Sequence, residues 1–344
     1  MENLEAKNFF NISVGTIIKI GLVIVGFIFL YLIRDILAVI LMSIVIASAI
    51  EPVVNILTRG RPPFLNFGLP RFISIIIVYL FIFALLVLLV YLVTFPLAGE
   101  IAHLSQNLPD YIQRLLPGFN LENQVRQLIQ KLPVNFEGLA PRVFEIASTT
   151  FNRLTDGIAV LILSFYLVVI ENGVENFLRY TIPNHYEEYA VDLWKRTKRK
   201  IGFWLQGQFL LGLIVGFLVF IGLSILNFPF ALVLAILAAL LEIIPIVGPI
   251  LAAIPAIAIG FLQSPTLGLG IFILYFAVQQ IESHVIVPNV LRKIVGLNPI
   301  FVIIALLVGA RLGGLFGLFL AVPAAGFIME LLSDFVGKKK SEIV

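Results

Sequence analysis

The sequence predicts an all-α polytopic membrane protein with about six full spans, two Pro/Gly-broken re-entrant hairpins and a small helical extracytoplasmic subdomain. Composition is the first reason: 60% of the 344 residues are hydrophobic and 12% are charged, whereas soluble domains carry about 25% charged residues. The second reason is the uncharged stretch 72–98, which exceeds the ~20 residues that cross a bilayer core. A membrane barrel would need alternating strands of about ten residues, and the sequence has no such pattern.

Composition also excludes several classes of function. With no cysteine and three histidines, the chain cannot form disulfides and has few ligands for zinc, so we expect no metal and no cofactor. No HExxH, Gly-x-Ser-x-Gly or P-loop motif is present, so we expect no enzymatic activity. We assign the net charge of +3 to cytoplasmic loops, and we therefore expect no nucleic-acid partner.

Residues 1–98 form a predicted N-terminal unit of three membrane spans. The first two spans, 12–32 and 36–57, are followed by the loop TRGRPPFLNFGLPR, which has three arginines and no acid. Because positively charged loops stay in the cytoplasm, we place this loop and the N-terminus there, and the third span, 72–98, leads out. The N-terminus lacks a signal-peptide cleavage pattern, so we expect the first span to remain attached.

Residues 99–150 are predicted to form the extracytoplasmic subdomain, because acids and bases are nearly balanced there and the helical periodicity is amphipathic. Helices lying on the membrane surface are the alternative arrangement. This subdomain is expected to be either a packing cap without contact to a substrate or a functional lid. Its predicted apolar stripe consists of Leu121, Val125, Leu128, Ile129 and Leu132.

Residues 151–200 return the chain to the cytoplasm through a predicted span at 158–170. The segment ends in KRTKRK, which has five bases in six residues. We interpret this run as a determinant of topology, with recognition of anionic lipids as the alternative.

Residues 201–335 are predicted to form the transport core, and the basic tail 336–344 follows in the cytoplasm. Two apolar segments in this core exceed the ~17–25 residues of one span, and each is interrupted by a Pro/Gly-rich sequence, PIVGP or GARLGG. Each fits either a re-entrant hairpin or one long kinked span. In order, the core consists of a span at 203–226, the broken segment 228–262, a span at 267–287 and the broken segment 299–332.

The bases Arg292 and Lys293 help to decide between hairpins and kinked spans. They lie in the cytoplasm if both broken segments are hairpins and outside if both are single spans, so two bases without a nearby acid favour hairpins. Two span-hairpin units of opposite orientation are typical of secondary transporters with inverted repeats, whose interrupted segments meet near the midplane. A transporter without a P-loop must draw on a gradient, so the chain is expected to be a secondary transporter or a channel.

Several motifs of the core closely resemble the autoinducer-2 exporter family of bacterial transporters. They are WLQGQFLLGLIVG, LEIIPIVGPILAAIPA and QQIESHVIVPNVLRKIVGLNPIFVIIALLVGARLGGLFGLFLAVPAAG, and the resemblance is densest over 185–331. It implies a multi-pass protein of the bacterial inner membrane that exports a small polar solute such as autoinducer-2. Exchange of sodium or lithium for protons is the alternative within the family. The resemblance also implies a homo-oligomer, for which a pentamer is one form.

Glu242 is the first candidate pathway residue, because a carboxylate in an apolar segment is costly unless it has a function. It precedes the predicted hairpin tip, formed by Pro245, Gly248 and Pro249. We interpret Glu242 as a carboxylate that binds a proton or a cation. The alternative is a carboxylate that caps backbone amides at the tip or lies in a hydrated hairpin mouth.

A polar stripe in the span 267–287 supplies the second group of candidates. On a helix, Gln279, Glu282 and Ser283 share one face, and Gln280 and His284 share the next. The stripe lines the solute pathway or binds a neighbouring helix, and His284 is a structural hydrogen-bonding residue or a proton relay.

Two further residues complete the predicted pathway. Asn289 belongs to the Val-Pro-Asn motif of the resemblance, and Arg311 lies at the second hairpin tip. Arg311 could pair with Glu242 or Glu282, bind an oxygen of the solute, or emerge into water. A membrane scaffold that binds a partner through residues 99–150 is the alternative function from a different class.

Overall fold

The computed structural model describes residues 14–59, 68–88, 91, 154–290 and 299–341. These residues form helices and turns with no strand among them, which confirms the predicted all-helical class. The predicted extracytoplasmic subdomain at 99–150 lies outside the described residues, as do Arg292 and Lys293.

Most of the described helices coincide with apolar segments of the sequence. In chain order they are α1 (Val14–Leu32), α2 (Arg34–Arg59), an unlabelled helix (Arg71–Leu88), α6 (Leu154–Val169), α7 (Gly173–Thr181), α8 (Asn184–Ile225), α9 (Ala231–Leu241), α10 (Val247–Gln263), α11 (Pro265–Ile281), a π-helical turn (Glu282–Ile286), α12 (Val287–Val290) and α13 (Pro299–Ser341). Of these, α7 and the first half of α8 are hydrophilic.

Among these residues, five helices are long and apolar enough to cross a membrane, and six if α6 and α7, bent by 82°, count as one broken span. The structure thus offers five to six candidate spans by length and composition, and the exact number of spans stays a prediction. The five are Arg34–Thr58, Arg71–Leu88, Asn184–Ile225, Pro265–Val290 and Phe316–Phe335.

Helix α8 is a single helix of 42 residues. It begins directly after Pro183, whose ring fixes a backbone angle that suits the start of a helix, and it contains no proline. The span predicted at 203–226 is therefore the second half of α8, and the hydrophilic residues that end at Lys200 form its first half.

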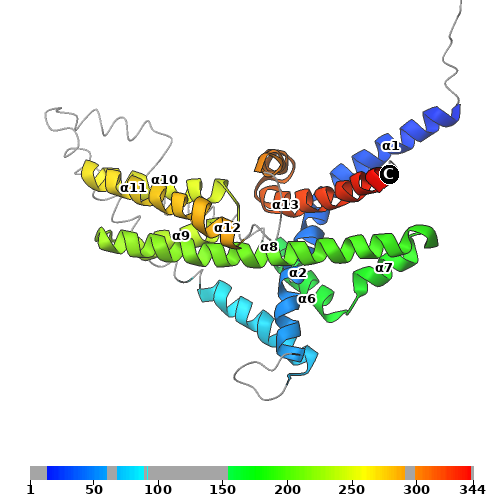
Figure 1. Cartoon of the computed structure of the whole chain (residues 1–344), viewed down its shortest axis with the longest axis horizontal. Coiled ribbons are helices and arrows are strands. Elements are labelled where there is room, and N and C mark those ends of the chain that lie inside the picture. Colours follow the sequence, from blue (N-terminus) through cyan, green and yellow to red (C-terminus); the bar gives the residue numbers. More distant parts are fainter. Residues whose placement is uncertain (1–13, 60–67, 89–90, 92–153, 291–298, 342–344) are drawn as a thin grey trace, which may run out of the picture.

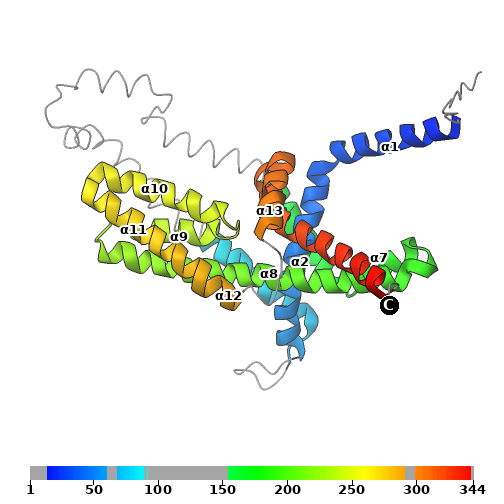
Figure 2. The ribbon, with the colours of Figure 1, turned by 45° about the horizontal axis from the view of Figure 1, so that its top comes forward.

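The largest apolar core lies between α8, α9, α10 and α11, which run side by side in both views (Figure 1 and Figure 2). Helix α8 approaches α9 closely, because a Cβ atom on Gly212 would lie 2.5 Å from the carbonyl oxygen of Ala239. Small residues of this kind let membrane helices pack backbone to backbone. Fully buried members of the core include Val219, Leu223, Ala252, Ala256 and Ile271.

Both predicted Pro/Gly breaks occur in the structure. The first separates α9 from α10 at residues 242–246, and the two helices pack against each other. The second lies inside α13, where Gly313 (φ −139°) and Gly314 (φ 55°) leave the helical conformation. The arms on either side of it cross so closely that a Cβ atom on Gly309 would lie 2.3 Å from the carbonyl oxygen of Gly317. That each of these two pairs, α9–α10 and the two arms of α13, enters and leaves the membrane on the same face stays a prediction.

The remaining helices pack around α2, which contacts α6, α8 and α13. Its buried side chains join two smaller cores, one with α8 and α13 through Trp204 and Leu320, and one with α6 through Val168. Helix α8 thus connects the α9–α11 group to the α2–α13 group, and Ile244 of the first break also packs against Leu306 and Ala321 of α13.

Candidate functional site

The first break is built around an unusual turn at Ile246. Its backbone angles are φ 68° and ψ −51°, and the N–H of Val247 donates to the carbonyl of Pro245 at 2.7 Å. This is the classic γ-turn, which is rare and strained, most of all for a β-branched residue. Strain of this kind costs about 1–3 kcal/mol and is concentrated at functional sites.

Glycine and proline make this turn sterically feasible. A Cβ atom on Gly248 would lie 1.8 Å from the carbonyl oxygen of Leu241, so the close approach of α10 to the end of α9 requires glycine there. Pro249 lies in the first turn of α10, where a missing N–H costs little. The structure therefore gives Pro245, Gly248 and Pro249 a role in shaping the break.

Glu242 lies at the end of α9 and is almost completely buried, with 1% of its surface exposed. Neither of its carboxyl oxygens has a hydrogen-bond donor in the described part of the chain. A buried charge without a partner is costly, so such a group is expected to be neutralised by a proton or a cation.

Gln208 of α8 holds the backbone of Glu242. Its Nε2 donates to the carbonyl oxygen of Glu242, which receives no backbone N–H among the described residues because the helix ends there. Gln208 is 1% exposed, and its Oε1 has no donor within the described residues. The site therefore contains three buried oxygens that accept no hydrogen bond from any described residue.

Glu282 supplies the second carboxyl group, directly after the end of α11. It is 7% exposed and opens the π-helical turn, and its Oε2 accepts a hydrogen bond from Nε2 of Gln279 at 3.0 Å. The carboxyl group of Glu282 lies close enough to that of Glu242 for the two to interact electrostatically.

The π-helical turn determines which side chains reach this pair. Such turns are rare and frequent at functional sites. Gln279 and Glu282 lie on the side of Glu242, and Ser283 lies 3.5 Å from Gln279. Tyr275 shares the buried face of α11 one turn earlier, and its hydroxyl group is buried without a partner among the described residues.

Four other predicted pathway residues do not join the carboxyl pair. Gln280, His284 and Asn289 are exposed, and the side chains of His284 and Asn289 bond to carbonyls of their own helical segment at 3.0 and 2.7 Å. Arg311 is also exposed, beside the break in α13, and within the described residues it forms no ion pair with Glu242 or Glu282.

Sequence reasoning missed Gln208 and Tyr275. Gln208 stands in the apolar run WLQGQFLLGLIVG beside Gly212 and Gly216, and an isolated amide next to small residues is a signal of a buried helix contact. Tyr275 precedes Gln279 and Glu282 at helical spacing on one face, so the polar stripe could have been extended to it.

Comparison with known proteins assigns the chain to a family. The model of the AI-2E family transporters matches residues 20–337. Three relatives are each named as a candidate transport protein. YueF of Bacillus subtilis is 28% identical over 83% of this chain and 80% of its own length, and YrrI of the same organism is 24% identical over 90% of this chain and 89% of its own length. The third, sll0063 of Synechocystis, is 30% identical over 77% of this chain and 71% of its own length. The family match covers nearly the whole chain, and it includes both breaks and the carboxyl pair. The protein is therefore a multi-pass membrane protein that belongs to the AI-2E transporter family.

Proposed function

We propose that this protein is a secondary transporter of the bacterial inner membrane that exports a small polar solute, such as autoinducer-2. In this proposal Glu242 and Glu282 couple export to a proton or cation gradient. Family membership supports transport, and the direction, the solute and the coupling are our inference. The homo-oligomer implied by the sequence resemblance stays a prediction.

The burial of Glu242 without a donor carries this proposal. Its two carboxyl oxygens and the Oε1 of Gln208 accept no hydrogen bond within the described residues, and these described residues place no cation beside them. An acceptor-only site of this kind is stable only when it holds a proton or a cation. Loading and unloading that charge would change the stability of the packing around the first break.

The mechanism assigns a task to each part of the site. Glu242 and Glu282 hold one proton between them while the site is closed to water, because two facing carboxylates repel each other. Gln279 keeps Glu282 in place, and Gln208 keeps the end of α9 in place. When hydration from one side stabilises the second negative charge, the proton leaves and α9 and α10 adopt a new position at the strained turn.

The oxygen-rich composition of the site favours a second candidate, exchange of sodium or lithium for protons. Hard cations prefer carboxylate and carbonyl oxygen ligands. The oxygens available are those of Glu242 and Glu282 and the Oε1 of Gln208. The two candidates differ in what is transported: a small polar solute driven by the gradient, or an alkali cation that is exchanged for protons at the carboxyl pair.

Flux in proteoliposomes tests the proposal. Candidate solutes would be loaded inside, with defined proton and sodium gradients, for the unmodified protein and for Glu242→Gln and Glu282→Gln. We expect each variant to lose the dependence of flux on external pH, or to stop, because glutamine cannot release a proton. Glu188→Gln, an exposed carboxylate on α8, is the matched control and should keep the pH profile. Unchanged rates and pH profiles in both site variants would refute the coupling mechanism.

A further inference from the structure

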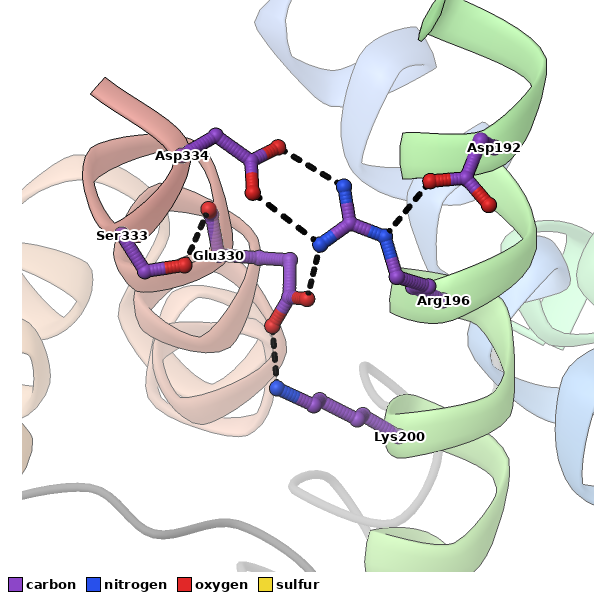
Figure 3. Close-up of polar contacts among 6 residues, drawn as sticks. All are labelled: Asp192, Arg196, Lys200, Glu330, Ser333 and Asp334. Atoms are coloured by element: carbon purple, nitrogen blue, oxygen red, sulfur yellow. Dashed lines mark hydrogen bonds and ion pairs between the residues drawn. The ribbon is translucent and has the colours of Figure 1, made fainter. Parts of the chain in front are cut away.

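A second cluster of charges joins α8 to the C-terminal part of α13 (Figure 3). Arg196 of α8 lies at its centre. Its Nε donates to Asp192 at 2.9 Å, its Nη1 to Glu330 at 2.7 Å, and its Nη2 to Asp334 at 2.7 Å. Lys200 forms an ion pair with the other carboxyl oxygen of Glu330.

The spacing of these residues explains why they meet. Asp192, Arg196 and Lys200 follow one another at i, i+4 along one face of α8, and Glu330 and Asp334 do the same on α13. The basic run KRTKRK is thereby divided between faces. Lys198 lies on the opposite side of α8, where it pairs with Glu51 of α2 at 2.6 Å.

The cluster is more than a solvated surface pair. The side chain of Glu330 is 8% exposed and that of Asp334 is 20% exposed, and each accepts charge-assisted hydrogen bonds from Arg196. The Nη1 of Arg196 also donates to Asp334 at 3.1 Å. Together with Asp192, the guanidinium group therefore binds three carboxylates at once. Such a contact is directional and has one favoured geometry, unlike apolar packing, which can slide.

The same part of α13 has two other features along its length. Nearer to the break, Phe319 meets Trp204 of α8 edge to face, with ring centroids 6.0 Å apart. Beyond it, Gly313 and Gly314 interrupt the helix. The segment Phe316–Phe335 therefore has the non-helical glycines just before it, the Trp204–Phe319 contact near the same end and the charge cluster at the other end.

We propose that the Arg196 cluster is an ionic latch that holds the segment Phe316–Phe335 against α8 and releases it as a unit. Release lets this segment rotate about the Trp204–Phe319 contact, with Gly313 and Gly314 absorbing the change in backbone angle. The latch links the two halves of the core, because α8 also holds the first break through Gln208. The latch depends on these contacts and not on the identity of a transported solute.

A distance measurement tests the latch directly, because the chain contains no cysteine. Spin labels would be attached to Lys195→Cys on α8 and Phe335→Cys on α13, both at exposed positions, in the full chain in lipid nanodiscs. The latched protein should give one dominant distance by double electron–electron resonance. Glu330→Gln combined with Asp334→Asn should increase a longer-distance population by about tenfold or more, because charge-assisted bonds are replaced by neutral ones. Glu188→Gln is the matched control and should leave the distribution unchanged.

Two further measurements keep the test decisive if the double variant does not fold. Arg196→Lys retains the charge but cannot reach three carboxylates at once, and it should populate the longer distance. Raising the salt concentration to about 1 M, where the screening length falls to about 3 Å, should do the same in the labelled protein without other changes. A single unchanged distance in the folded variants and at high salt would overturn the latch, and none of these readouts requires transport.

Discussion

Replacing Gln208 by leucine tests whether α8 fixes the carboxyl pair through a single amide. Leucine keeps the volume but removes the hydrogen bond to the carbonyl of Glu242, which has no other donor among the described residues. A buried carbonyl without a donor costs about 1–3 kcal/mol. Since about 1.4 kcal/mol is a factor of ten, the population with Glu242 in place should fall roughly 5- to 150-fold.

Gln206 offers a matched control on the same helix. Its Nε2 donates to the carbonyl of Ala49 in α2 at 2.7 Å, away from the carboxyl pair. Ala49 lies inside α2, where its carbonyl also belongs to the helical hydrogen-bond pattern. Gln206→Leu should therefore lower the melting temperature less than Gln208→Leu.

The assay combines two readouts on purified protein. Thermal unfolding in detergent measures stability, and flux in proteoliposomes across a proton gradient, per folded protein, measures coupling. We expect Gln208→Leu to lose both stability and coupling, and Gln206→Leu to keep coupling. Equal effects of the two variants on coupled flux would refute the assignment of Gln208 to the site.

Two further predictions concern the breaks. Gly248→Ala should destabilise the protein by about 1–3 kcal/mol, because its Cβ would meet the backbone of Leu241. Gly326→Ala is the control, because nothing lies within 4 Å of the added carbon. Equal melting temperatures of the two variants would contradict the close approach of α10 to the end of α9 at the first break. Asn298→Cys should resist a membrane-impermeant thiol reagent added outside intact cells, because the double hairpin predicted from the sequence would place it in the cytoplasm. Labelling from outside would exclude the double hairpin.

The sequence predicted the breaks and the carboxylates better than their environments. Prolines and glycines interrupt helices for local steric reasons, so PIVGP and GARLGG could be located without a structure. The polar stripe at Gln279 and Glu282 followed from helical periodicity. Its extension by a π-helical turn could not be predicted, since one added residue in a turn depends on the helices packed around it.

Residues whose role depends on a distant partner were the hardest to predict. Gln208 acts on a carbonyl 34 positions away in the sequence, and only the packing of α8 on α9 brings them together. The bases of KRTKRK were interpreted by their charge alone, yet Arg196 and Lys200 bind α13 while Lys198 binds α2. Arg311 was considered as a partner for the glutamates because it lies near a break, but proximity in sequence did not place it beside them.

The contrast between Glu330 and Glu242 gives the strongest argument that the carboxyl pair is functional. Both are buried acids at helix contacts, but Glu330 is fully paired with Arg196 and Lys200, whereas Glu242 receives no donor within the described residues. If burial of Glu242 served stability, neutralising it would be harmful. We expect the opposite: Glu242→Gln should raise the melting temperature, because the amide can donate to Glu282, at the cost of coupling. Glu330→Gln should lower stability by about 1–3 kcal/mol, because it leaves two cations short of a partner. A fall in melting temperature for both variants would mean that Glu242 is a structural residue. The carboxyl pair would then not be the coupling site.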